Sequence, residues 1–195
     1  MEKISARRFF PFPSGCAFTR DLVCLNSLDF AGWRFLPGML FKAQEKWWAE
    51  GRRAGRHNGL DLRLYETKNA EVRALPEGAK IPLLKAGKIV RIIPDFIGHS
   101  IFAEHEEFLF PPGGEKAKKR LFTIYGHVVP EEGIEGRRLD CGSVLGKIAP
   151  AKGIVPPHLH ISMALVPGNI PLEGLRWEVF DQAEGVAFLD PAEVI

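Results

Sequence analysis

Three short stretches of the sequence combine histidine with other groups that are able to bind a metal ion or transfer a proton. The first reads His57-Asn58-Gly59-Leu60-Asp61, the second Tyr125-Gly126-His127-Val128, and the third Pro156-Pro157-His158-Leu159-His160-Ile161. Imidazole and carboxylate groups bind zinc in many proteins, and imidazole also exchanges protons near neutral pH. These stretches therefore supply the candidate functional residues.

The third stretch places two imidazoles on one face of an expected strand. Side chains alternate between the two faces of a strand, so His158 and His160 point the same way while Ile161 and Met163 face the core. Such a pair can chelate one metal ion. Alternatively, one imidazole binds the metal and the other acts in catalysis, and the residues alone leave both interpretations open.

The first stretch can add two further ligands. Asp61 lies on the strand face opposite Leu60 and Leu62, and a turn at Gly59 can fold His57 back beside it. Histidine and aspartate suit zinc, and three protein ligands leave a fourth position open for water, as in catalytic zinc sites. A single histidine at the start of a strand is usually only a hydrogen-bonded polar group, so this prediction depends on the three stretches occurring together.

Short strands separated by turns are expected to position these residues. The chain has 20 glycines and 15 prolines, which favours strands and turns over a helix bundle. A turn signal at 111–114 predicts a hairpin between the strands on either side of it. We predict a mainly β fold with an antiparallel β-sheet or β-sandwich core. Its expected strands cover 60–65, 89–93, 100–104, 121–125, 144–148 and 160–166.

The N-terminal part of the chain lacks this regular pattern. We predict that residues 1–56 form an irregular, partly helical extension before a domain of residues 57–195, with a helix within 40–54. The aromatic residues of the extension are expected to cover an edge or a face of the β core. The alternative is that part of it lies across the site, with Asn26 or Asp29 at the open metal position.

Composition excludes several classes of protein. The chain has 195 residues, of which 26 are Lys or Arg and 24 are Asp or Glu, and the net charge of +2 does not favour a nucleic-acid partner. No apolar run approaches the roughly 18 residues of a membrane span. Prolines interrupt the apolar run at 9–13, so no signal peptide is expected there and the localisation stays open.

The three cysteines do not form a recognisable framework. Cys16, Cys24 and Cys141 lack zinc-ligand spacing and are interpreted as reduced thiols. The alternative is a disulfide between Cys16 and Cys24, which would leave Cys141 free. In either case a metal site must come from histidine, aspartate or glutamate.

The three histidine stretches resemble, in order, the motifs of the lysostaphin/LytM-type zinc metallopeptidases, which cut peptide bonds in bacterial cell-wall peptidoglycan. That family has an H-x-G-x-D motif, a tyrosine-to-histidine strand motif and a P-H-L-H motif. The resemblance covers roughly residues 57–195, and the glycine-rich stretch that precedes P-H-L-H in the family is replaced here by 149–156. Further stretches that resemble family strands lie at 81–90, 98–105 and 141–148, and Asp190-Pro191 matches the closing D-P of the family.

The resemblance implies a role for each histidine of these motifs. One zinc ion per chain would be held by His57, Asp61 and His160, while His127 and His158 would be the catalytic histidines. One of these two would take a proton from the attacking water and the other would stabilise the oxyanion, and which does which stays open. The resemblance also implies a structural role for His105.

The implied function is that of a zinc metalloendopeptidase acting on peptidoglycan cross-bridges or stem peptides. One alternative is a noncatalytic LytM-like module that binds cell wall or regulates another hydrolase, although such modules typically lose ligands. The other is a cytoplasmic zinc hydrolase with another substrate, which the missing export signal favours. The family implies a cell-envelope or secreted location, and the oligomeric state is not predicted.

Overall fold

The computed structural model of the chain describes residues 18–105 and 119–195. Cys16 and the expected turn at 111–114 lie outside the described residues. Cys24 has a free thiol and Cys141 is disulfide-bonded, so both interpretations of the cysteines are wrong. None of the helices in the described part of the chain has the length and apolar character needed to cross a membrane.

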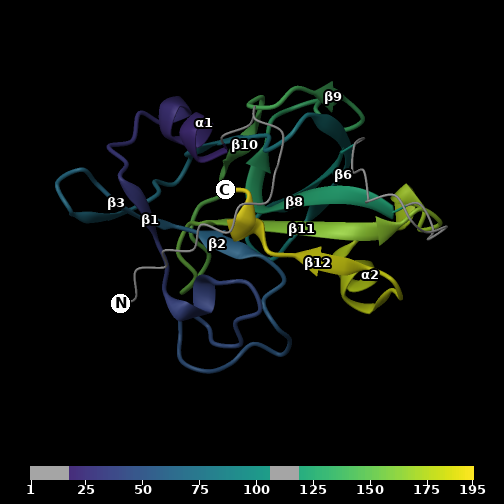
Figure 1. Cartoon of the computed structure of the whole chain (residues 1–195), viewed down its shortest axis with the longest axis horizontal. Helices are drawn as coiled ribbons and strands as arrows, with labels where there is room; N and C mark the ends of the chain where they lie inside the picture. Colours follow the sequence, from purple (N-terminus) through teal and green to yellow (C-terminus); the bar gives the residue numbers. More distant parts are fainter. Residues whose placement is uncertain (1–17, 106–118) are drawn as a thin grey trace.

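One antiparallel sheet forms the centre of the molecule (Figure 1). Its long strands lie side by side, and shorter strands extend it at both edges. The main path is β12 (Ala187–Leu189), β11 (Leu159–Pro167), β8 (Lys119–Pro130), β7 (His99–His105), β6 (Gly87–Pro94) and β9 (Arg138–Leu139). Off this path, β2 (Leu60–Leu62) pairs with β11, and β10 (Val144–Ile148) pairs with both β8 and β5 (Lys80–Pro82).

A second, three-stranded sheet joins the N-terminal segment to the rest of the chain. It consists of β1 (Gly32–Arg34), β3 (Leu64–Glu66) and β4 (Val72–Ala74), with β3 in the middle. The α-helices of the described residues are α1 (Phe18–Leu25) and α2 (Trp177–Gln182), and 3-10 turns cover Pro37–Met39, Leu172–Gly174 and Pro191–Glu193. The prediction of a mainly β, antiparallel fold with an irregular, partly helical N-terminal segment is confirmed.

The prediction of a helix within 40–54 is wrong. Residues 40–54 are all described, and they form turns and bends with an isolated β-bridge between Glu45 and Arg52. The bridge folds this stretch back on itself, and Gly51 has a φ of +101° that suits such a reversal. The large apolar residues here resemble a helical pattern in sequence, but their tertiary contacts determine the backbone instead.

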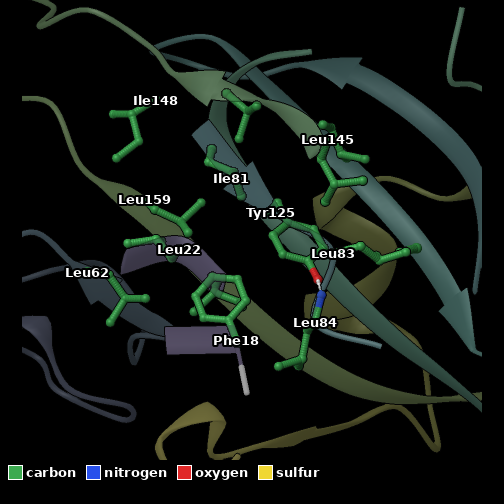
Figure 2. Close-up of a cluster of buried hydrophobic side chains, with 14 of the residues drawn as sticks. Phe18, Leu22, Leu62, Ile81, Leu83, Leu84, Tyr125, Leu145, Ile148 and Leu159 are labelled. Atoms are coloured by element: carbon green, nitrogen blue, oxygen red, sulfur yellow. Dashed lines mark hydrogen bonds between the residues drawn. The ribbon is translucent and has the colours of Figure 1, made fainter. Parts of the chain in front are cut away.

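Both faces of the central sheet are buried. Along β8 the side chains of Thr123 and Tyr125 point to one face while those of Phe122 and Ile124 point to the other, as period 2 requires. The larger apolar cluster contains Tyr125 and receives Phe18 and Leu22 from α1 (Figure 2). The N-terminal segment therefore covers one face of the core, as expected.

Tyr125 is the largest fully buried side chain of this cluster. Its hydroxyl oxygen accepts a hydrogen bond of 2.8 Å from the backbone N–H of Leu84, drawn as a dashed line in Figure 2. Burial raises the pKa of the Tyr125 hydroxyl above its usual range. A buried hydroxyl without a hydrogen-bond partner would cost free energy. The bond from Leu84 avoids this cost and holds the loop after β5 against β8.

His105 lies at the end of β7, where it is buried and hydrogen-bonded. Its Nδ1 donates to the carbonyl oxygen of Ala86 at 3.1 Å, so the neutral ring accepts at Nε2 from the hydroxyl of Thr123 at 2.8 Å. Burial lowers the pKa of His105 to about 4. These contacts lie away from the other histidines and agree with a structural role.

We expect His105 to make the fold sensitive to acid. An unfolded chain protonates this imidazole near pH 6.5, whereas the folded chain resists protonation down to about pH 4. The unfolded state therefore binds more protons between these values, and the free energy of unfolding decreases as the pH falls, by up to roughly 3 kcal/mol in total. Urea unfolding of metal-free protein between pH 4 and 7 should show a shallower pH dependence for His105→Gln than for the natural chain. Equal slopes would contradict this.

Candidate metal centre

The three histidine motifs lie on neighbouring strands. Asp61 on β2 is directly opposite His160 on β11, and His160 is in turn opposite Gly126 on β8. The antiparallel register therefore places the first motif, the residue before His127 and the H-x-H motif beside one another. The sheet brings together residues that are about one hundred positions apart in the sequence.

Gly59 allows the first motif to pack closely against β11. A Cβ atom at this position would lie 2.4 Å from the carbonyl oxygen of Ile161 and 2.8 Å from Cε1 of His160. Neither distance is compatible with a side chain unless the backbone moves. The glycine of the H-x-G-x-D motif is thus explained by this close approach, which puts His57 within reach of His160.

Three potential ligand atoms converge at this point. Nε2 of His57 lies 3.1 Å from Oδ1 of Asp61 and 3.1 Å from Nδ1 of His160, and the last two atoms are 2.8 Å apart. All three residues are buried. In a tetrahedral zinc site with bonds of about 2.0–2.1 Å, neighbouring ligand atoms are roughly 3.3 Å apart. The triangle therefore has nearly the size of one face of such a site.

His57 and His160 each make a hydrogen bond through the ring nitrogen that faces away from Asp61. These bonds determine which nitrogen of each ring carries the lone pair. Nδ1 of His57 is 2.9 Å from the carbonyl oxygen of Leu40, which can only accept, so Nε2 of the neutral ring is unprotonated. Nε2 of His160 is 2.8 Å from the hydroxyl of Ser162, and that hydroxyl is oriented to donate to Asn58. His160 then donates from Nε2 and keeps its lone pair at Nδ1. Three lone-pair atoms face one another, an arrangement that a cation satisfies.

The charge states of these groups suit a metal ion. Burial alone would raise the pKa of Asp61, but hydrogen bonds and positive charge from His160 and His57 in their protonated forms outweigh it and hold this pKa well below its usual range. Burial lowers the pKa of His160 to about 4. At neutral pH the site therefore offers a carboxylate and neutral imidazole, which are the forms that bind zinc.

His127 and His158 lie next to this cluster. Their ring centroids are 4.7 Å apart, and Nε2 of His158 is 3.8 Å from Oδ1 of Asp61. Nδ1 of His158 donates to the carbonyl oxygen of Pro156 at 2.9 Å, which leaves Nε2 as the acceptor nitrogen. Burial lowers the pKa of His158 to about 4, so its ring is neutral at pH 7.

Asp95 supports His127, and sequence reasoning missed it. Its Oδ1 accepts from the backbone N–H groups of Ile97 and Gly98, and its Oδ2 accepts from Ser100 and from the backbone N–H of His127 at 2.8 Å. Nδ1 of His127 lies 3.2 Å from the same Oδ2. An aspartate three residues before a glycine, between two strands, is a turn signal from which it could have been recognised.

The environment of Asp95 favours its charged form. Burial would raise the pKa of Asp95, but the hydrogen bond and charge of His127, followed by the backbone donors, lower it below its usual range. His127 itself has a φ of +65°, a strained value for a residue with a side chain. The bond from its backbone N–H to Asp95 helps to hold this conformation.

The N-terminal segment reaches the site through residues other than those expected. The amide of Asn26 is bonded to the backbone of Lys80, and Asp29 interacts electrostatically with Arg73, so neither lies at an open metal position. Instead, Trp47 and Arg53 contact Asp61. No pattern in the sequence indicated either residue.

The matches to known proteins are similarities of fold, found among solved structures. No family model and no curated protein matches the sequence. Among solved structures, the chain is similar to a zinc containing peptidase from Vibrio cholerae, with 18% identity, a TM-score of 0.46, and coverage of 69% of this chain and 35% of that one. It is also similar to a putative peptidase M23 from Pseudomonas aeruginosa, with 21% identity, a TM-score of 0.45, and coverage of 91% and 60%.

A third similar structure is the catalytic domain of the antimicrobial peptidase lysostaphin from Staphylococcus simulans. The identity is 13%, the TM-score is 0.44, and the match covers 83% of this chain and 94% of that domain. The chain thus spans about a third and three fifths of the lengths of the first two proteins, and most of the third. At these identities and TM-scores, the likeness establishes neither substrate nor activity in this chain.

Proposed function

We propose that the chain is a zinc-dependent peptidase that hydrolyses peptide bonds, with peptidoglycan cross-bridges or stem peptides as its substrate. The observation that carries the proposal is the convergence of three lone-pair atoms, from His57, Asp61 and His160, beside two further imidazoles. A set of three ligands with acid–base groups next to it is typical of catalytic zinc. The substrate class is supported by the resemblance of the motifs alone.

A zinc ion held by His57, Asp61 and His160 would supply the Lewis acid of the proposed reaction, since bound zinc lowers the pKa of water and polarises a carbonyl group. His158 is the base, because its acceptor nitrogen Nε2 is the one on the side of Asp61 and its other nitrogen is occupied by Pro156. A neutral imidazole in this position can take the proton of the attacking water and later deliver it to the leaving amine.

His127 is the group that stabilises the oxyanion in this proposal. Its Nδ1 is 3.2 Å from the carboxylate of Asp95, which holds the ring beside His158, where its other nitrogen can donate to developing negative charge. The exposed ring of Phe96 packs edge-on against His127 at 4.8 Å between centroids. The pair formed by Asp95 and Phe96 therefore limits the orientations that His127 can adopt.

Digestion of purified peptidoglycan tests the proposal. Protein loaded with one equivalent of zinc should release peptide fragments with new amino termini, identified by mass spectrometry, and a synthetic glycine-rich cross-bridge peptide should be cleaved at the same bond. Chelator treatment and the His158→Ala variant should each abolish cleavage. The proposal is wrong if zinc-loaded protein cleaves neither peptidoglycan nor short peptides containing glycine or D-residues.

A further inference from the structure

The two oxygens of Asp61 face different partners. Oδ1 lies between the imidazoles of His57 and His160, at 3.1 and 2.8 Å. Oδ2 accepts a hydrogen bond of 2.7 Å from the indole N–H of Trp47 and another of 3.1 Å from the guanidinium of Arg53. The Asp61 side chain is only 2% exposed, so these groups take the place of water around the carboxylate.

Both donors come from the segment 37–56, which precedes the first of the three histidine motifs. In Figure 1 this segment forms the blue loops below β2. Its backbone is bonded to the first ligand, since the N–H of Lys42 donates to the carbonyl oxygen of His57 and the N–H of His57 donates to that of Ala43. Leu40 in the same segment accepts the Nδ1 proton of His57. The segment is thus attached to two of the three proposed ligands.

The two donors are themselves held in place. Arg53 also donates to the carbonyl oxygen of Gly38 at 3.0 Å, and its guanidinium lies 4.5 Å from the ring of Trp48. The ring of Trp47 packs edge-on against the ring of His158 with 5.0 Å between centroids, and against Trp48 at 5.5 Å. Their hydrogen bonds to Asp61 therefore have a defined direction.

This arrangement has a consequence for metal binding. A carboxylate with two free oxygens can bind a metal ion through one oxygen or through both, and the second mode changes the coordination number. With Oδ2 engaged by two donors, Asp61 offers only Oδ1 on the side of His57 and His160. Hydrogen bonds from outside the ligand set commonly determine ligand orientation in this way.

We propose that Trp47 and Arg53 are positioning residues of the metal site, which fix Asp61 as a ligand through Oδ1 alone and make the segment 37–56 part of that site. The inference rests on the zinc site of the proposed function but not on peptidase activity. Arg53 also brings a positive charge near the metal ion, so its removal alters charge and geometry together. Trp47 is neutral, and its replacement isolates the hydrogen bond.

The test is Trp47→Phe in the full chain, with Trp33→Phe as the matched control, since the indole N–H of Trp33 donates to the hydroxyl of Thr19 and has no contact with Asp61. Phenylalanine at position 47 keeps an aromatic ring against His158 and removes only the indole donor. Competition with a chromogenic chelator should show a zinc dissociation constant raised 10- to 100-fold in Trp47→Phe and unchanged in Trp33→Phe. Cobalt(II) in place of zinc should show weaker visible absorption bands in Trp47→Phe, since a second carboxylate oxygen raises the coordination number.

A measurement on the natural chain covers the case in which Trp47→Phe does not fold. With ¹⁵N-labelled tryptophan, the indole N–H signal of Trp47 should shift when one equivalent of zinc is added, while that of Trp33, which donates to Thr19, stays in place. Zinc affinity and a cobalt spectrum equal to those of the natural chain in a folded Trp47→Phe variant would overturn the inference. An indole signal of Trp47 that does not respond to zinc would also overturn it. Protein that binds zinc but cleaves no peptide would refute the proposed activity and leave both measurements valid.

Discussion

Replacement of His160 by alanine is expected to weaken zinc binding by a factor of about 100 to 1,000. A complete ligand set contributes about 10–16 kcal/mol in small zinc domains, so one ligand accounts for about 3–4 kcal/mol of the binding free energy. His160 contributes Nδ1, which lies within 3.1 Å of the candidate ligand atoms of both His57 and Asp61. Titration of the metal-free protein with zinc against a chelator of known affinity measures the effect.

His158→Ala is the control, because it removes the same side chain from the same strand region two residues away. The acceptor nitrogen of His158 is 3.8 Å from Oδ1 of Asp61, further than the atoms of the converging triangle. His57→Ala, which changes a residue outside the strands, should lose affinity to the same extent as His160→Ala. If His160→Ala binds zinc as tightly as the natural chain, His160 is not a ligand.

Short apolar runs between turn signals were sufficient to predict the long strands of the central sheet. The expected strand at 160–166 corresponds to β11, Leu159–Pro167, and the one at 100–104 to β7, His99–His105. Both strands are buried on their two faces and carry apolar side chains there. The pairing of β7 with β8 is the hairpin that the turn signal indicated, whereas no signal in the sequence indicated the pairing of β11 with β8. Apolar runs and turn signals are local properties, so the strands themselves could be recognised.

The short edge strands could not be predicted in the same way. β9 consists of Arg138–Leu139 and β12 of Ala187–Leu189, lengths at which alternation has no meaning. Their extended conformation follows from the hydrogen bonds that β6 and β11 offer to them. Strands this short form because a neighbouring strand offers hydrogen-bonding groups, and their sequences carry no pattern that predicts them.

The motif spacing predicted which histidines to consider, and the structure brings His57, Asp61 and His160 within 4.8 Å of one another. Their roles remain predictions until a metal ion is measured. The supporting residues Trp47, Arg53 and Asp95 were not anticipated, because each reaches the site from a loop. A loop position has no periodicity that relates it to a distant strand, so even a recognisable turn residue such as Asp95 can be assigned to His127 only from the folded chain.

Replacement of His158 by alanine is expected to lower peptide hydrolysis by a factor of about 100 to 10,000 while zinc remains bound. This is the usual contribution of a positioned acid–base group. His158 has the arrangement that a base requires, since Nδ1 donates to Pro156 and Nε2 keeps its lone pair. His127→Ala should reduce the rate as well, because it removes the ring that the proposal places at the oxyanion. The measurement is the rate of cleavage of the best peptide found, with zinc content determined on the same samples.

The two histidine variants require a control that leaves the site intact. Val72 lies on β4 in the smaller sheet and is 49% exposed, so Val72→Ala should change neither rate nor zinc content. Retained zinc together with lost turnover in His158→Ala would separate the base from the ligands of the H-x-H motif. Loss of zinc in His158→Ala, with zinc retained in His160→Ala, would instead mean that the two histidines have the opposite roles. Full activity in His158→Ala would show that the base is a different group, and His127 would then be the next candidate, since its ring lies 4.7 Å from that of His158.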